Sequence, residues 1–319
     1  MAGDVIDLKS FNRYFSGDNR FTIPTPQILE LNRQITEWID GNACGAIIHG
    51  KSRSGKTRSI VYITEHLKRE YGNALPIIII NANSSELSHA PTQKAFYQKL
   101  LVDVRHEDPY KGTTVQLRTR LMNRLIECAL DTKYRRIVFF IDEAYQLDEK
   151  EYNWLIDIYN ELAQNNILLT VFLFGTRELV EQKRGFVCNK KEQIVLRFMS
   201  REFEFHGIRS LKELSICLAS LDTPFVLDGR EIIISESFFP EAYNEGKRMM
   251  SWARDLWEAF QSVRAAANIS EKEVLMVHFM ETVRYCITKN GRFGKALFEP
   301  GVEEWIEAVK ESGYDTTQM

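Results

Sequence analysis

The segment Gly50-Lys51-Ser52-Arg53-Ser54-Gly55-Lys56-Thr57 constrains the fold of this chain more than any other feature. It fits the pattern G-x-x-x-x-G-K-[ST], in which a glycine-rich loop wraps around phosphate groups. A short apolar run at 43–49 precedes the loop, and a stretch with helical periodicity at 57–71 follows it. A phosphate loop between a strand and a helix predicts an α/β domain built on a parallel sheet.

The residue types within this loop suit a nucleoside triphosphate. Gly50 and Gly55 let the backbone curl so that its N–H groups point at phosphate oxygens. The start of the following helix adds partial positive charge. Lys56 is expected to neutralise the β- and γ-phosphates, and the Thr57 hydroxyl to ligate Mg²⁺. We therefore predict that ATP and Mg²⁺ are bound by the whole loop, namely by Gly50, Lys51, Ser52, Arg53, Ser54, Gly55, Lys56 and Thr57.

Strands and helices alternate along residues 27–205. Apolar runs after the loop predict four more strands, at 75–81, 136–141, 167–174 and, at an edge of the sheet, 202–205. Helical periodicity marks the stretches around them, at 27–40, 57–71, 90–132 with a break near 108–112, and 149–165. This alternation predicts a parallel sheet with helices on both faces.

The pattern changes after residue 210, where we expect helices alone, at about 210–220, 236–245, 246–267 and 271–289. We predict four parts: an N-terminal segment and helix (1–40), an α/β ATPase domain (41–208), a small helical lid domain (209–290) and an acidic C-terminal tail (291–319). From Glu299 onward the tail holds six acidic residues against one lysine. We expect a solvated segment there, with docking to a partner as the alternative.

The strand at 136–141 runs into two adjacent carboxylates, Asp142 and Glu143. Such carboxylates must be hydrated or paired, so their position at the end of a buried strand needs a cause. If this strand lies beside the loop-bearing strand, Asp142 reaches the Mg²⁺ shell and Glu143 acts as general base toward the attacking water. A helix cap or turn is the alternative. Thr176, which follows the strand at 167–174, is expected at the same ligand-binding edge, where it contacts the γ-phosphate or serves as a turn residue.

Isolated arginines offer further contacts to the nucleotide. Arg197 lies inside an apolar run, so we expect it at a rim or interface. There it can reach the γ-phosphate of a neighbouring subunit as an arginine finger, the alternative being a solvated or salt-bridged side chain. Arg184 and Arg201 are the other choices for this role. In the helical region, Arg248 or Lys247 can fold back on the nucleotide or simply begin a solvated helix.

These features together resemble the AAA+ ATPases, specifically the TnsC/TniB group of transposition regulators, with MuB as a more distant relative. The resemblance covers about residues 25–285, and its more specific parts are Phe-Gly-Thr-Arg-Glu-Leu at 174–179, Leu-Arg-Phe at 196–198, Leu221-Asp-Thr-Pro224, Glu245-Gly246 and Ala267-Asn-Ile-Ser270. It implies an ATP-dependent homo-oligomer, a ring or a filament, on double-stranded DNA. This oligomer links a target-selection protein, TniQ-like or RNA-guided, to a transposase, and slow ATP hydrolysis dismantles it.

The charge distribution bears on DNA binding. The net charge of −3 argues against strong binding by a single subunit. Residues 94–136 nevertheless carry ten basic residues against five acidic ones, and residues 177–212 carry nine against five. Cations and hydroxyls at 111–120 suit contacts to backbone phosphates, although a solvated helix face is the alternative. We predict that an ATP-assembled oligomer binds duplex DNA through Lys111, Thr113, Thr114, Arg118 and Arg120.

The bulk properties leave other classes open. Residues 1–15 hold no apolar core of a secretory signal, no apolar run could span a bilayer, and five cysteines are scattered singly. We expect a cytoplasmic bacterial protein with no membrane partner. The competing interpretations are an AAA+ ATPase of another system, either secretion-associated or helicase-loading, and a nucleotide-dependent signalling switch that ignores DNA. A small-molecule kinase is a weaker alternative, because the Asp-Glu pair favours hydrolysis.

Overall fold

The computed structural model describes residues 8–12, 15, 22–82, 92–130, 132–291 and 299–316. The chain divides into two compact units. The first holds residues 31–52 and 59–205, and the second holds residues 1–30, 53–58 and 206–319. Much of the predicted N-terminal segment and the first two residues of the helical stretch predicted at 90–132 lie outside the described residues.

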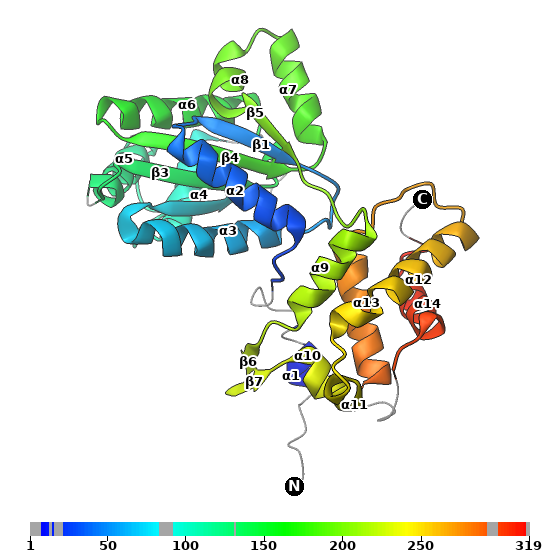
Figure 1. Ribbon diagram of the computed structural model, residues 1–319. Coiled ribbons are helices and arrows are strands. Elements are labelled where there is room, and N and C mark those ends of the chain that lie inside the picture. The colour runs from blue at the N-terminus through cyan, green and yellow to red at the C-terminus, as the bar shows by residue number, and fades with distance from the viewer. Residues whose placement is uncertain are drawn as a thin grey trace. The chain divides into compact units, whose positions relative to one another are not determined.

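A five-stranded parallel sheet forms the centre of the first unit (Figure 1). Its order is β2-β3-β4-β1-β5. The strands are β1 (Gly45–His49), β2 (Ile77–Asn81), β3 (Arg136–Asp142), β4 (Leu168–Gly175) and β5 (Arg201–Glu204). The α/β class and all five strands are therefore confirmed. β1 and β3 are buried along their whole length, as expected for inner strands covered on both faces, whereas β2 lies at an edge and leaves Ile79 42% exposed.

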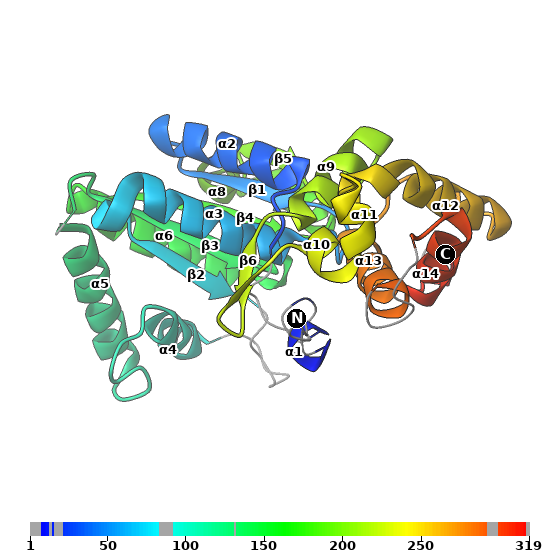
Figure 2. The same ribbon diagram turned by 60° about the horizontal axis from the view of Figure 1, so that its bottom comes forward.

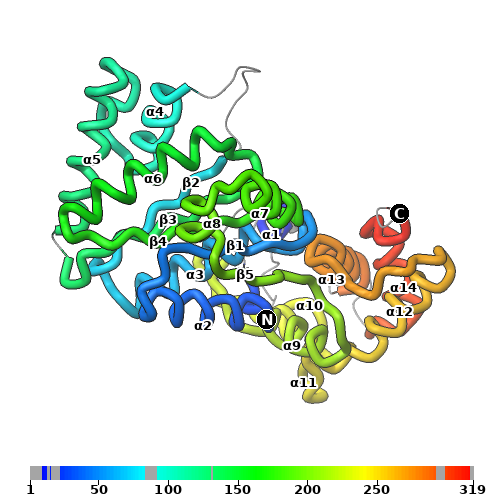
Figure 3. The backbone as a smooth tube through the Cα atoms, turned by 90° about the horizontal axis from the view of Figure 1, so that it is seen from above, coloured from blue at the N-terminus to red at the C-terminus, as the bar shows by residue number. Residues whose placement is uncertain are grey.

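Helices cover both faces of this sheet, as Figure 3 shows from above. α2 (Pro26–Asp40) and α3 (Lys56–Tyr71) lie on one face, where Trp38 stacks on Phe172 of β4 at 6.1 Å. The other face carries α4 (Gln93–Asp103), α5 (Thr114–Leu130), α6 (Glu149–Gln164), α7 (Glu178–Cys188) and α8 (Glu192–Phe198). Alternate residues of β3 and β4 pack on these five helices, which follows from the two-residue period of a strand.

The helices α7 and α8 were not expected from the sequence. The sequence pattern assigned only a rim or interface position to Arg197 within this apolar run, and no helix. Within α8, Ile194 and Phe198 are buried while Leu196 is 67% exposed. This i, i+4 spacing is a helical face, and the run is too short for its period to be recognised alone.

The second unit is mainly helical. Its helices are α1 (Leu8–Asn12), α9 (Leu211–Leu221), α10 (Ile234–Phe238), α11 (Pro240–Asn244), η4 (Met249–Trp252), α12 (Ala253–Ala266), α13 (Met276–Asn290) and α14 (Val302–Glu311). The helical stretches predicted after residue 210 are present, with the second one divided by Pro240. A hairpin of β6 (Phe225–Leu227) and β7 (Arg230–Ile232) was not expected. Its Asp228-Gly229 turn, with φ of 49° and 78°, is the strongest short hairpin signal and was overlooked.

The C-terminal residues correct one expectation. Residues 299–316 do not form a solvated tail, because α14 packs against α12 and α13. Trp305, Ala308 and Val309 are fully buried, and so is Tyr314. The net charge of the segment concealed an apolar stripe of helical spacing. None of the helices in the described ranges combines the length and apolar character needed to cross a membrane. The two remaining short helices are η2 (Gly72–Ala74) and η3 (Ala144–Gln146).

Candidate nucleotide-binding site

The carboxyl ends of β1, β3 and β4 meet at one edge of the sheet. Ile141 of β3 pairs with Leu173 of β4, which pairs with Ile47 of β1. Asp142 is therefore level with Ile48, which lies two residues before Gly50, the first residue of the loop. The condition that the acidic strand lies directly beside the loop-bearing strand is not met, since β4 lies between them. Strand spacing places their ends about 10 Å apart, at the edge where α/β proteins bind ligands.

Gly50 is fixed by backbone contacts on both sides. Its N–H donates to the Gly175 carbonyl at 3.2 Å, and the N–H of Phe205 donates to the His49 carbonyl at 2.7 Å. A Cβ atom at Gly50 would overlap the carbonyl oxygen of Phe205 and lie 3.0 Å from its carbonyl carbon. Only glycine fits this position, so the loop leaves the sheet tightly packed against the end of β5.

The rest of the loop has the backbone of an anion-binding turn. Arg53 and Gly55 have φ of 61° and 108°, so successive N–H groups turn toward a common side. α3 begins at Lys56, which is 6% exposed. Ser54 is fully buried, and its hydroxyl has no hydrogen-bond partner among the described residues. A hydroxyl that needs an acceptor, within a ring of N–H donors, fits a phosphate group.

Neither carboxylate caps α6, and Glu143, which precedes the short helix η3, makes no side-chain cap bond there. Asp148, not Asp142 or Glu143, caps α6, and it forms a capping box with Glu151. Asp142 is 7% exposed and its Oδ1 accepts from the N–H of Glu143 at 3.1 Å. Glu143 has φ of 54°, a left-handed backbone that costs a non-glycine residue free energy. Strain of this kind is tolerated where the surrounding fold imposes it, and it turns the chain sharply at the sheet edge.

Thr176 lies at the same edge, directly after β4. Its hydroxyl is buried and has no partner among the described residues. Its neighbour Gly175 is the acceptor for the loop N–H of Gly50. The edge therefore brings together the start of the loop, Asp142, Glu143 and Thr176 within one compact unit.

Arg197 lies at the amino ends of the strands, opposite the carboxyl ends where the loop begins. A Cβ atom on Gly45 would come within 2.9 Å of the Arg197 carbonyl oxygen, so Arg197 is adjacent to the amino end of β1. Its guanidinium lies 5.6 Å from the Tyr159 ring. Because a five-residue strand spans about 17 Å, Arg197 cannot reach the loop of its own chain. Two other arginines were candidates for the finger. Arg201 is also at the amino end of its strand, β5, and Arg184 forms an exposed ion pair within α7.

Arg248 and Lys247, the two candidates for a nucleotide contact from the helical unit, already have local partners. Arg248 donates to the carbonyls of Tyr243 and Lys247 at 3.1 and 2.7 Å, and its guanidinium lies 3.7 Å over the Tyr243 ring. Lys247 pairs with Glu299 and Glu245. A nucleotide contact by Arg248 would require these interactions to break, and that contact stays a prediction.

The residues predicted to contact DNA lie on α5 and on the turn between α4 and α5 (Figure 2); α4 contacts β2, and α5 contacts β3 and α6. Thr113 caps α5, since the Gln116 N–H donates to its hydroxyl at 3.4 Å. Arg120 holds the turn by donating to the carbonyls of Asp108 and Lys111 at 2.5 and 3.0 Å. These two side chains therefore shape the turn.

The remaining residues of this group differ in exposure. Thr114 is the first residue of α5, and Arg118 forms an ion pair with Glu161 of α6. Lys111 is exposed at the tip of the turn, beside Tyr110, which is 68% exposed. Lys111 thus presents its charge to solvent, and the Arg118 side chain is also 42% exposed beside its ion pair.

A small pocket in the second unit was not recognised from the sequence. It is lined by Thr25, Pro26, Gln27, His206, Gly207, Ile208, Glu213, Cys217 and Met276. The buried carboxylate of Glu273 accepts from the Gly207 N–H at 2.5 Å. Burial raises the pKa of the Cys217 thiol to about 12, so this side chain stays neutral. The lining comes from three distant segments without a shared motif, so no sequence pattern indicates it.

One contact relates this pocket to the part of the phosphate loop that belongs to the second unit. The N–H of Val277, next to Met276, donates to the Arg53 carbonyl at 3.4 Å.

Residues 40–182 match the sequence profile of a family described as AAA domain. No curated protein sequence matches the chain. Among solved structures it is similar to the ORC2 protein of Aeropyrum pernix in ADPNP and ADP complexes, with 13% identity over 94% of this chain and 71% of that chain and a TM-score of 0.58. It is also similar to Drosophila ORC bound to DNA, with 11% identity over 88% of this chain and 42% of that chain and a TM-score of 0.51. These likenesses concern the fold, a five-stranded parallel sheet flanked by helices and followed by a helical region.

Proposed function

We propose that this protein is an AAA+ ATPase that binds Mg²⁺-ATP on the loop at 50–57 and hydrolyses it. The observation that carries the proposal is the sheet edge where the loop, two carboxylates and Thr176 gather. The buried hydroxyls of Ser54 and Thr176, which lack partners among the described residues, supply donors for an acceptor-rich ligand.

Each residue has a role that follows from its chemistry. Bound Mg²⁺-ATP supplies a polarised γ-phosphate that water can attack. Lys56 neutralises phosphate charge, and Thr57 and Asp142 hold the cation. Glu143 orients the water and accepts its proton, and the Thr176 hydroxyl donates to the γ-phosphate. Asp142 is buried, and the next residue, Glu143, has a strained left-handed backbone. Such strain is typical of functional sites and favours hydrolysis over simple nucleotide binding.

Arg197 acts on a neighbouring subunit in this proposal. It lies at the sheet edge away from its own loop, so a catalytic contact requires a second copy of the chain. Assembly is then coupled to ATP, because the active site is complete only between subunits. Arg197→Ala is expected to leave ATP binding by the monomer intact and to slow hydrolysis by about 10³-fold.

We further propose that the ATP-bound oligomer assembles on double-stranded DNA and links a target-selection protein to a transposase. The sequence resemblance to the TnsC/TniB regulators supports this role. The likeness of the fold to ORC proteins favours a second candidate, a DNA-bound loader of a helicase. Assembly on duplexes of unrelated sequence, together with a neighbouring transposase gene, supports the first role, whereas assembly confined to one sequence supports the second.

Nucleotide binding tests the basis of both roles. Lys56→Met removes the phosphate-contacting charge, and Lys150→Met removes an exposed charge on α6 as a matched control. A fluorescent ATP analogue should bind the wild type and the Lys150 variant equally and the Lys56 variant at least tenfold more weakly. Equal binding by all three proteins would refute the assigned site.

A further inference from the structure

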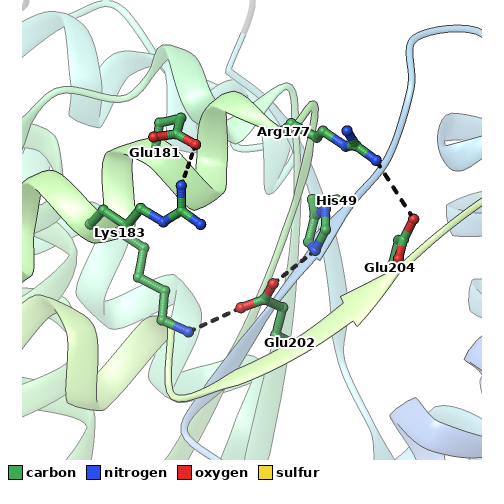
Figure 4. A network of polar contacts seen from close by, with 7 residues as sticks. His49, Arg177, Glu181, Lys183, Glu202 and Glu204 are labelled. Atoms are coloured by element: carbon green, nitrogen blue, oxygen red, sulfur yellow. Dashed lines mark hydrogen bonds and ion pairs between the residues drawn. The ribbon is translucent and has the colours of Figure 1, made fainter.

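A polar network joins the base of the phosphate loop to two other elements (Figure 4). His49 is the last residue of β1 and precedes Gly50. Its Nε2 lies 2.9 Å from Oε1 of Glu202 on β5. The second oxygen of Glu202, Oε2, lies 3.2 Å from Nζ of Lys183 on α7. One carboxylate thus contacts both the strand that leads into the loop and the helix that follows Thr176.

The histidine is an unusual choice at its position. The four residues before it in β1 are Gly, Ala, Ile and Ile, and all are buried. His49 is 8% exposed, and its Nδ1 is buried with no partner among the described residues. A buried polar atom without a partner costs free energy that an apolar side chain would avoid. The bond to Glu202 is therefore the interaction that a histidine makes at this position and an apolar side chain could not make.

The carboxylate determines how the imidazole is held. An ionised carboxylate only accepts hydrogen bonds, so the proton of His49 that faces Glu202 sits on Nε2. This interaction fixes the ring orientation at the point where the backbone leaves the sheet. Lys183 holds the other oxygen. The Lys183 and Glu202 side chains are 24% and 40% exposed, so solvent partly screens this ion pair.

A second carboxylate on β5 provides a contrast. Glu204 lies 3.9 Å from Arg177, and the two side chains are 48% and 71% exposed. Exposed pairs of this length contribute little. Glu202 and Glu204 are therefore the same residue type on the same edge strand. Glu204 pairs with His49 through the strand backbone, whereas the Glu202 side chain bonds to the His49 imidazole.

We propose that Glu202 is a positioning residue for the phosphate loop. It acts through His49 and Lys183, and it fixes the first residues of the loop relative to α7 and Thr176. The inference rests on the proposed function only for the identity of the ligand that the loop binds. It predicts that removing the carboxylate loosens the loop even when no nucleotide is present.

Hydrogen exchange of the ligand-free full-length protein tests this directly. Glu202→Ala should speed exchange of the amides at 50–55 about tenfold, the change expected from losing one charge-assisted hydrogen bond. Glu202→Gln keeps an acceptor for His49 and should restore most of the protection. Glu204→Ala is the matched control and should leave exchange at 50–55 within about twofold of the wild type.

The possible outcomes separate the explanations. Equal exchange at 50–55 in the wild type and Glu202→Ala would overturn the proposal, and so would equal acceleration by Glu204→Ala. If Glu202→Ala does not fold, Lys183→Met decides: the proposal requires faster exchange at 50–55, and a change confined to α7 would overturn it. Failure of the wild type to bind an ATP analogue would refute the proposed function, while the exchange result would still decide the role of Glu202.

Discussion

Replacing Gly50 by alanine tests whether the loop is held against β5 as tightly as the structure indicates. Gly50 has no positive φ, so alanine meets no conformational penalty there. The added Cβ would overlap the Phe205 carbonyl oxygen and lie 3.0 Å from the carbonyl carbon, closer than the ordinary contact range of 3.4–4 Å. The obstacle is backbone, so it cannot rotate away, and the strand end or the loop must move.

The cost follows from what this movement breaks. Separating the two backbones strains the bond from the Phe205 N–H to the His49 carbonyl, now 2.7 Å long. A lost hydrogen bond costs about 1 kcal/mol, and overpacking adds about 1–3 kcal/mol. We therefore expect Gly50→Ala to lower the free energy of unfolding of the first unit by about 2–4 kcal/mol. Nucleotide binding should weaken as well, because the loop is displaced.

Gly185→Ala is the matched control. Gly185 lies within α7 of the same unit, and a Cβ atom there meets nothing within 4 Å. This variant should gain about 0.5–1 kcal/mol from helix propensity. Urea unfolding followed by hydrogen exchange of β3 amides reports on this unit alone, which avoids assuming a single transition for the whole chain. A Gly50→Ala variant with wild-type stability, or one no worse than Gly185→Ala, would refute the reasoning.

Three further predictions concern other parts of the chain. Trp305→Ala should cost about 3–5 kcal/mol in urea unfolding of the second unit, because the side chain is fully buried; unchanged stability would contradict the packing of α14. Tyr152→Phe should cost about 1 kcal/mol, since the hydroxyl donates to Gln182 at 2.9 Å, and thermal unfolding checks this. Burial raises the pKa of Asp103 to about 6, so the folded state binds this proton more tightly than the unfolded chain and stability falls as pH rises from about 4 to 6. Asp103→Asn removes this dependence, so its stability relative to the wild type should rise by about 1–2 kcal/mol between pH 4 and 7 in parallel urea titrations; a constant difference would contradict the raised pKa.

The sequence was most informative where local pattern and function coincide. The loop at 50–57 and the carboxylates after β3 were recognisable because their residue types are unusual at the ends of apolar strands. The strand order was not recognisable, because pairing depends on contacts between distant segments, and β4 separates β1 from β3. Arg197 illustrates the same limit, since only the register shows which edge of the sheet it occupies.

The helical unit was harder to predict for two physical reasons. Average charge concealed the apolar stripe of α14, whose acidic residues solvate the outer face of a buried helix. The pocket near Gln27 and His206 is assembled by tertiary packing from residues of ordinary type. The His49–Glu202 bond belongs to the same class, because it joins residues 153 positions apart. Such features carry no periodicity and become visible only in three dimensions.

The central claim is that ATP binding at the loop assembles this protein on DNA. Sedimentation velocity of the full-length protein with a fluorescent duplex, with and without Mg²⁺ and a non-hydrolysable ATP analogue, tests it most directly. We expect the duplex to sediment with a large oligomer only when the analogue is present, and Lys56→Met to abolish this shift. Sedimentation of the free duplex under both conditions, or an equal shift without nucleotide, would contradict it.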